Sequence, residues 1–318
     1  MRVFSYFYFF FLQILTLTMS SKEDTSNTMM LSCASCGKTE GDGIQLRTCT
    51  ACKSVRYCGV ICQRNHRPKH KKACKKRAAE LRDEILFKQP ESSHYGDCPI
   101  CLLPLPLVPD GSVHHDCCSK LVCRGCLYAY IERVKQERRE PTCPFCRDVT
   151  GKSDVKQKMI KRVQANDPSA TCQMGMRLDK EGKYAEAVAY YSKAAELGDA
   201  NAHFNLSLMY QKGQGVEKDE KKCLYHTEEA TIKGQLDARF GLAQHDCLNG
   251  RETRAVKHLI IAANLGHDKS MKALKDCYKN GLVSKEDFAG ALRAHKAAVD
   301  AMKSPEREAA MIIMSSHR

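Results

Sequence analysis

The spacing of hydrophobic and polar positions divides the chain into parts with different periods. From residue 168 to residue 302, alanine and leucine recur at helical spacing, and Gly198, Gly234 and Gly266 each close an alanine-rich stretch. This period of roughly thirty to thirty-six residues lies in the range of helical solenoids. Four further glycines stand where turns between paired helices need positive φ: Gly182, Gly213, Gly250 and Gly281. The pattern predicts four helix pairs, over 168–199, 200–235, 236–267 and 268–302.

Shorter helices are predicted outside this region. One is expected over residues 75–89, ended by Pro90, in a helical linker that runs from residue 75 to residue 97. A second amphipathic helix is expected directly after Cys126, with its apolar face formed by Leu127, Ile131 and Val134. Residues 148–167 are expected to form a charged linker. Residues 303–318 are expected to form a tail whose Met311–Met314 segment docks on the last repeat.

The cysteine content is high, and nineteen cysteines in 318 residues need an explanation. Fifteen lie between Cys33 and Cys146, fourteen of them in cysteine pairs and Cys74 paired with His70; the other four are scattered through the helical region: Cys172, Cys223, Cys247 and Cys277. Clustered pairs favour zinc over disulfides, and zinc sites favour a reducing compartment, the cytoplasm or the nucleus. Fifteen thiolates and four zinc ions would lower the formal charge from +14 to +7. Basicity alone is therefore weak evidence for a nucleic-acid partner.

Residues 33–74, here called the first finger, hold four pairs of potential metal ligands. The pairs are Cys33-x2-Cys36, Cys49-x2-Cys52, Cys58-x3-Cys62 and His70-x3-Cys74. The i, i+4 spacing of the last pair places both side chains on one helical face, toward one metal. With Tyr57 and Gln63 beside the third pair and a His-Lys-Lys run at His70, the segment resembles a MYND zinc finger.

The MYND resemblance implies two structural zinc sites. One would consist of Cys33, Cys36, Cys58 and Cys62, and the other of Cys49, Cys52, His70 and Cys74. His66 lies four residues before His70 and is a competing ligand, although a solvated helix position is the simpler interpretation. The segment departs from the family at Arg67, where a tryptophan commonly precedes the proline, here Pro68. The sequence therefore does not determine how the helix that contains Pro68 packs on the rest of the finger.

Residues 98–147, here called the second finger, hold four more cysteine pairs. They are Cys98-x2-Cys101, Cys117-Cys118, Cys123-x2-Cys126 and Cys143-x2-Cys146. A two-residue spacing aims two thiolates at one tetrahedral ion, so eight ligands suffice for two zinc ions. The segment resembles a RING finger in an all-cysteine variant. Disulfides or buried thiols are the alternative, which eight cysteines in this order make less plausible.

The RING resemblance implies interleaved sites in the second finger. One would consist of Cys98, Cys101, Cys123 and Cys126, and the other of Cys117, Cys118, Cys143 and Cys146. The adjacent second pair departs from the family, which usually spaces these ligands apart and often uses a histidine. Cys117 and Cys118 are the expected ligands, and His115 is the alternative to one of them.

A RING finger implies ubiquitin ligation without a covalent intermediate. Such a finger holds a ubiquitin-charged conjugating enzyme in position for attack by a substrate lysine. The matching docking residues are Ile100, Leu127, Pro144 and Phe145; Arg147 matches the arginine that hydrogen-bonds both the enzyme and ubiquitin. If these side chains only pack the zinc loops, the finger is a structural module.

The helical region resembles Sel-one-like repeats, relatives of the tetratricopeptide repeat, most fully from Ala200 to Gly234. Such solenoids offer concave surfaces to partner proteins, and MYND fingers bind short proline-containing peptides. The chain is thus predicted to be a zinc-binding RING-type ligase whose first finger and repeats select partners, or a non-enzymatic adaptor. Nucleic-acid binding is a third hypothesis, based on eight Lys and Arg without acids from Arg64 to Arg77. Without interleaved aromatic residues, a solvated helix face is favoured.

The expected fold class is therefore small zinc-stabilised α+β modules followed by an all-α helical-repeat solenoid. No catalytic residue is predicted, since both fingers have complete ligand sets and neither contains an open metal position. The apolar, phenylalanine-rich residues 1–18 are typical of a signal peptide and short for a membrane span. Either the true start is Met19, ahead of a disordered stretch over 19–32, or residues 1–18 form an anchor that leaves the rest in the cytosol. Only a retained segment 1–18 would bring a membrane partner.

Overall fold

The computed structural model describes residues 32–41, 43–108, 110–149 and 155–316. The hypotheses on residues 1–18, and nearly all of the stretch expected to be disordered, lie outside this range. The described residues up to Ile85 form one compact unit, and those from Leu86 onward form a second. Among the helices of the described ranges, none has both the length and the apolar character that a membrane span requires.

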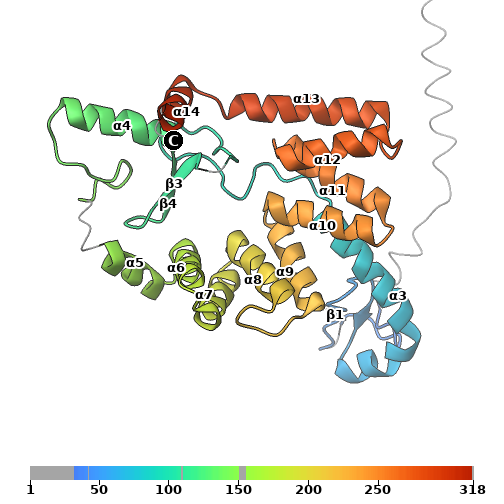
Figure 1. Ribbon diagram of the computed structural model, residues 1–318. Helices are drawn as coiled ribbons and strands as arrows, with labels where there is room; N and C mark the ends of the chain where they lie inside the picture. The colour runs from blue at the N-terminus through green and yellow to red at the C-terminus, as the bar shows by residue number, and fades with distance from the viewer. Residues whose placement is uncertain (1–31, 42, 109, 150–154, 317–318) are drawn as a thin grey trace, which may run out of the picture. The chain divides into compact units, whose positions relative to one another are not determined.

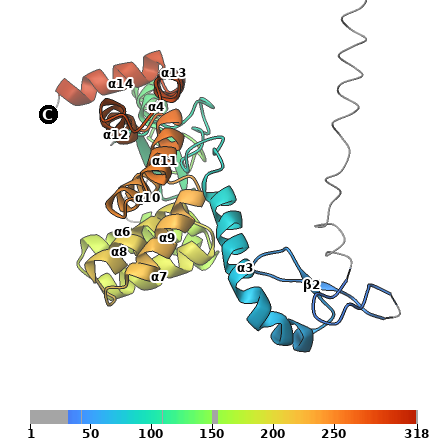
Figure 2. The same cartoon turned by 90° about the vertical axis from the view of Figure 1, so that its right-hand side faces the viewer.

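The first unit contains the first finger and most of one long helix (Figure 2). Strands β1 (Arg47–Thr48) and β2 (Arg56–Tyr57) pair antiparallel, with Arg47 opposite Tyr57. Helix α3 (Val60–Leu86) follows and includes Pro68, whose ring removes one helical hydrogen bond. The buried core is small and made largely of the potential ligands: Cys33, Leu46, Cys49, Cys52 and Tyr57. The expected helix over 75–89 is thus the end of a longer one.

The second finger lies in the second unit, after the residues that follow α3. Strands β3 (Ser112–His115) and β4 (Lys120–Cys123) form an antiparallel hairpin in which Ser112 faces Cys123. Helix α4 (Arg124–Gln136) begins at once, capped by the Cys123 side chain, which accepts a hydrogen bond from the Cys126 N–H. The predicted amphipathic helix is therefore present and begins two residues before Cys126. The buried core of the second finger is again rich in cysteine: Cys98, Leu105, Val122 and Cys123.

The predicted repeat region is a succession of helices, each packed on the next (Figure 1). Each predicted pair range holds two helices, in order α6 (Pro168–Lys180), α7 (Tyr184–Glu196), α8 (Ala200–Lys212), α9 (Glu220–Ile232), α10 (Leu236–Leu248), α11 (Glu252–Asn264), α12 (Asp268–Lys279) and α13 (Lys285–Ala301). Helix α5 (Val155–Gln164) precedes them, and α14 (Pro305–Ser316) follows. The predicted fold class, small cysteine-rich modules followed by an all-α helical-repeat region, is confirmed.

Close helix packing in the repeats depends on small residues. Ala187, Ala194 and Ala202 are fully buried around Tyr191, which is 1% exposed. Gly215 has a positive φ of 70°, and a Cβ there would lie 2.5 Å from the carbonyl of Tyr184. Only glycine meets both conditions, because an L side chain is strained in that conformation and would clash with the neighbouring helix.

The segment Leu86–Tyr95, here called the linker segment, is bound to the repeats. Arg239, which is 1% exposed, donates hydrogen bonds to the carbonyls of Leu86 and Thr231 at 2.8 and 3.2 Å. The ring of Phe87 lies 4.6 Å from that of His258, centroid to centroid. Because Arg239 takes the Leu86 carbonyl, α3 ends at Leu86, before Pro90 and not at it.

The C-terminal tail departs from its prediction. It forms helix α14, which packs on α4 of the second finger, whereas docking on the last repeat was expected. Met311 and Ile312 remain 55% and 68% exposed. Arg307 of α14 also donates hydrogen bonds to the second finger.

Candidate metal centres and the surfaces beside them

Four groups of potential ligands come together, and together they contain all sixteen predicted residues. Within each group the ligand atoms lie within 4.8 Å of one another. The groups are Cys33, Cys36, Cys58 and Cys62; Cys49, Cys52, His70 and Cys74; Cys98, Cys101, Cys123 and Cys126; and Cys117, Cys118, Cys143 and Cys146. In both fingers the first and third ligand pairs along the chain form one site, and the second and fourth pairs form the other. Each finger is thus closed across two sites.

Backbone turns hold the cysteine pairs. In five of them the residue after the second cysteine has φ between 54° and 74°: Gly37, Lys53, Leu102, Ser119 and Arg147. Its N–H donates to the carbonyl four residues earlier at 2.8–3.0 Å. The turn brings both thiols to one side. The sequence gives little warning of it, since only Gly37 is a glycine; the signal is the position directly after a Cys-x2-Cys pair.

Backbone N–H groups also favour the thiolate form of the first cysteine in a pair. Burial raises the pKa of Cys33, but N–H donors from Cys58, Cys36 and Ser35 outweigh it and lower the pKa to about 6. At Cys98, burial is likewise outweighed by the N–H groups of Cys101, Cys123 and Ile100, which lower the pKa to about 7. The thiolate is the form that binds a metal.

His70 is the only histidine in these groups, and its Nε2 lies 3.3 Å from Cys52 Sγ. Burial, followed by the like charge of His66, lowers the pKa of His70 and favours the neutral ring that ligates zinc. His66 is engaged elsewhere: its Nδ1 lies 3.1 Å from the Tyr57 hydroxyl, and its ring stacks on His70 at 5.6 Å. The structure therefore groups His70, and not His66, with the cysteines.

The adjacent pair Cys117 and Cys118 both reach the second site of the second finger. Cys117 Sγ lies 3.5 Å from Cys146 Sγ, and Cys118 Sγ lies 3.8 Å from Cys143 Sγ. A tight turn explains this, because the N–H groups of Cys118 and Ser119 both donate to the His115 carbonyl. His115 itself is outside the group.

The donor sets fit zinc and do not fit disulfides. Every cysteine of the described ranges is a free thiol, and the sulfur–sulfur separations of 3.5–3.9 Å exceed the roughly 2.0 Å of a disulfide. Burial and the neighbouring thiols raise the pKa of Cys118 to about 11. Gathering such groups needs a cation. Three sites offer four cysteines each and one offers three cysteines with a histidine, and both are donor sets of structural zinc. Four zinc ions fit the chain, where they would stabilise the loops.

The predicted docking residues fall into two sets. Leu127 and Pro144 line one groove of about 370 Å³, together with Tyr130, Ile131 and Val134. The other three lie outside its lining: Ile100 and Phe145, each 41% exposed, and the exposed Arg147. The Lys120 Nζ lies 5.9 Å from the Phe145 ring centroid. All five side chains are at least partly accessible.

A second groove lies on the first finger and was not predicted. It measures about 430 Å³ and runs beside the site of Cys49, His70 and Cys74. Its lining includes Tyr57, Val60 and Gln63, together with four cations: Arg64, Arg67, Lys71 and Lys75. Within the described residues, none of these cations pairs with a carboxylate. Arg67, the position where the family commonly has tryptophan, is thus part of a basic wall.

Comparison with known proteins agrees with this division. Residues 33–74 match the MYND finger family, and residues 171–199, 200–234 and 249–267 match the Sel1 repeat. A mouse protein named DAP3-binding cell death enhancer 1 is 25% identical over 42% of this chain and 34% of its own length. The chain thus spans about a third of that relative. The segments define a zinc-binding protein that combines a MYND finger with Sel1 repeats.

Two solved structures share part of the helical region. A Sel1 repeat protein from Oxalobacter formigenes is 29% identical, with a TM-score of 0.41, over 48% of this chain and 66% of that one. The protective antigen c5321 of uropathogenic Escherichia coli is 20% identical, with a TM-score of 0.38, over 52% of this chain and 36% of that one. Repeats of this class bind other proteins.

Proposed function

We propose that the second finger is a RING-type ubiquitin ligase module and that the first finger and the repeats select its protein partners. The observation that carries this proposal is the accessibility of the docking residues. The second finger packs on other elements at both metal sites, yet Ile100, Phe145 and Arg147 stay exposed, and Leu127 and Pro144 line an open groove. Apolar side chains that a partner can cover are what a docking surface requires.

The role of the chain's residues in this reaction is positioning. Ile100, Leu127, Pro144 and Phe145 would bind an apolar loop of the conjugating enzyme, and zinc would fix the loops that carry them. Arg147 would donate from its forked guanidinium to carbonyl or carboxylate oxygens across the contact. Holding the ubiquitin thioester of the conjugating enzyme near a substrate lysine raises the rate of ubiquitin transfer without a covalent intermediate on this chain.

Self-ubiquitination tests this proposal. The zinc-loaded chain would be incubated with a panel of ubiquitin-conjugating enzymes, and chain formation compared with Ile100→Ala and Arg147→Ala. Each substitution removes a contact at the centre of the docking surface, and we expect rates to fall about tenfold or more. Leu248→Ala and Arg133→Ala are matched controls, since both residues are exposed and lie outside the docking surface. Absence of chains with any enzyme, from protein with four zinc ions, would disprove ligase activity.

The non-enzymatic adaptor is the second candidate, and the groove on the first finger favours it. An apolar floor of Tyr57 and Val60 beside four cations suits a proline-containing peptide with acidic flanks. This binding is compatible with either function, since a ligase would use it to recruit substrate. Loss of ligase activity would leave peptide binding unaffected.

A pair of charge reversals separates groove binding from general attraction to polyanions. Lys71 and Lys75 line the groove, whereas Lys72 and Lys76 lie one position further along the same helix and do not. We expect Lys71→Glu with Lys75→Glu to weaken binding of a fluorescein-labelled acidic, proline-containing peptide about tenfold or more. The matched pair Lys72→Glu with Lys76→Glu should change it little. Equal losses in both double variants, with steep salt dependence, would instead indicate a nucleic-acid-type polyanion.

A further inference from the structure

Arg307, in the first turn of α14, is buried against the first metal site of the second finger. It is 5% exposed, although it lies far along the chain from every cysteine of that site. Its guanidinium donates to the carbonyls of Pro104, Met302 and Leu103 at 2.7, 2.6 and 3.3 Å, and to Cys101 Sγ at 3.3 Å. The loop that it holds, Cys98–Leu105, carries the docking residue Ile100.

The charge of Arg307 needs an anion nearby. A buried cation is costly unless it is paired, and within the described residues no carboxylate bonds to Arg307. The sulfur of Cys101 is the group in hydrogen-bond contact that can carry negative charge. Four thiolates and one zinc ion have a net charge of −2, so a metal-loaded site supplies this partner. A set of neutral thiols would leave the guanidinium uncompensated.

The backbone of α14 lies close to Gly125, which stands between two further ligands of the same site. A Cβ built on Gly125, between Cys123 and Cys126, would lie 2.7 Å from the Arg307 nitrogen and 2.9 Å from its Cα. Gly125 is buried, and the absence of a side chain permits this approach. Helix α14 therefore lies directly against the turn that carries Cys123 and Cys126, while its arginine holds Cys101.

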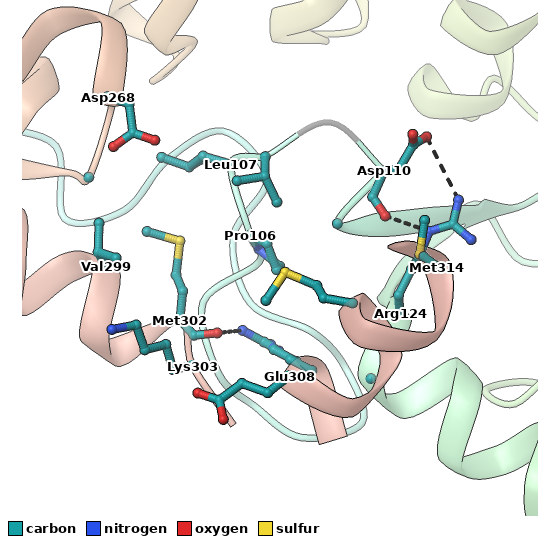
Figure 3. A pocket seen from close by; sticks show the side chains of 16 residues that line it. Pro106, Leu107, Asp110, Arg124, Asp268, Val299, Met302, Lys303, Glu308 and Met314 are labelled. Carbon is teal, nitrogen blue, oxygen red and sulfur yellow. Dashed lines mark hydrogen bonds and ion pairs between the residues drawn. The ribbon is translucent and has the colours of Figure 1, made fainter. Parts of the chain in front are cut away.

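Helix α14 packs on α4 but leaves a pocket open on one side, so the polar contacts of Arg307 add to what positions it. A pocket of about 530 Å³ is lined by Met311 and Met314 of α14, Leu107 of the finger and Val299 of α13. Figure 3 shows Met302 and Met314 facing this space, with the Met302 carbonyl engaged in a hydrogen bond. A cavity of this size forfeits the dispersion contacts that would otherwise fix a helix.

We propose that α14 is an integral part of the second finger and that Arg307 is the positioning residue of its first metal site. Arg307 lowers the free energy of the metal-bound form and holds the Ile100 loop in the conformation that docks a partner. Displacing α14 would then weaken zinc binding at this one site. The statement about metal holds independently of ligase activity; only the effect on docking rests on the proposed function.

Zinc release from the full, zinc-loaded chain into a chromophoric chelator tests this inference. In Arg307→Met, which keeps the length and loses the charge, we expect one of the four ions to leave about ten to a hundred times faster. Hydrogen exchange over residues 98–105 should rise with it. Arg307→Lys should fall between the two, because lysine keeps the charge but loses the fork. Arg293→Met, on the exposed face of α13, is the matched control and should release zinc like the unchanged chain.

The possible outcomes decide between the two proposals. Unchanged release from Arg307→Met, or equal acceleration of all four ions, would overturn the role assigned to Arg307. If one ion leaves faster while even the unchanged chain forms no ubiquitin chains, the positioning role stands and the ligase proposal fails. If Arg307→Met folds poorly, a Gly125→Ala variant provides a second test, since its methyl group must displace α14 without removing the charge.

Discussion

Removal of zinc should unfold both fingers while the repeat helices persist. The buried core of each finger is made largely of its ligands, so little apolar burial remains once the metal is gone. Structural zinc in such small modules contributes roughly 10–16 kcal/mol of apparent folding free energy. Excess chelator should therefore raise hydrogen exchange to the unprotected level over residues 33–58 and 98–123. Circular dichroism should retain the signal of α6–α13, whose core contains no metal ligand.

The control for this experiment is restoration by metal. Adding zinc back under reducing conditions should restore the protection of both fingers from hydrogen exchange. The substitution Cys247→Ser, at an exposed cysteine outside every cluster, should leave zinc content and protection unchanged. Protection that survives chelation in either finger would contradict a structural role for its metal. Loss confined to the first finger would show that packing on α14 and the repeats holds the second.

Acid should loosen the linker segment from the repeats before it unfolds the helices. Burial lowers the pKa of His94 to about 4. Burial, followed by the charges of Arg239 and Arg254, lowers the pKa of His258 to about 3, although Asp246 lies 3.6 Å away. Because both values are depressed, the stabilising contribution is complete above the ordinary histidine pKa and is lost as the pH falls below it. Each histidine should cost about 2 kcal/mol at pH 5 relative to pH 8.

Denaturant titrations of the repeat helices at several pH values would measure this loss. His94→Phe and His258→Phe keep a ring of similar shape and cannot bind a proton, so the double variant should lose most of the pH dependence. His245→Phe, at a more exposed position on α10, serves as the control. An acid loss as steep in the double variant as in the unchanged chain would assign the effect to other groups.

The two fingers differ in the elements that surround them. The first finger lies in its own compact unit and presents a basic groove beside one metal site. The second finger belongs to the same unit as the repeats, and α5 and α6 contact it beside its second site: Arg162 Nε of α5 donates to the Cys117 carbonyl at 3.0 Å, and Arg177 of α6 pairs with Asp116. The predicted docking residues Ile100, Phe145 and Arg147 remain exposed.

The sequence by itself determined the local patterns. Short spacing determined the eight ligand pairs, because so few intervening residues cannot separate the two side chains, whereas the combination of the pairs into four groups followed from the MYND and RING resemblances and agrees with the structure. The glycine and alanine period determined the four helix pairs for the same reason, since helix packing in a solenoid joins neighbours along the chain. Both are short-range properties, which one sequence contains in full.

The tertiary structure decided what depends on contacts distant in sequence. The left-handed residues Lys53, Leu102 and Arg147 carry no glycine signal, because the zinc turns impose that conformation on whichever residue follows the second cysteine. Arg307 lies about two hundred residues from the cysteine it holds, and Arg239 ends α3 from about a hundred and fifty residues away. No periodicity or spacing encodes such pairs, because their geometry exists only once the helices between them have packed.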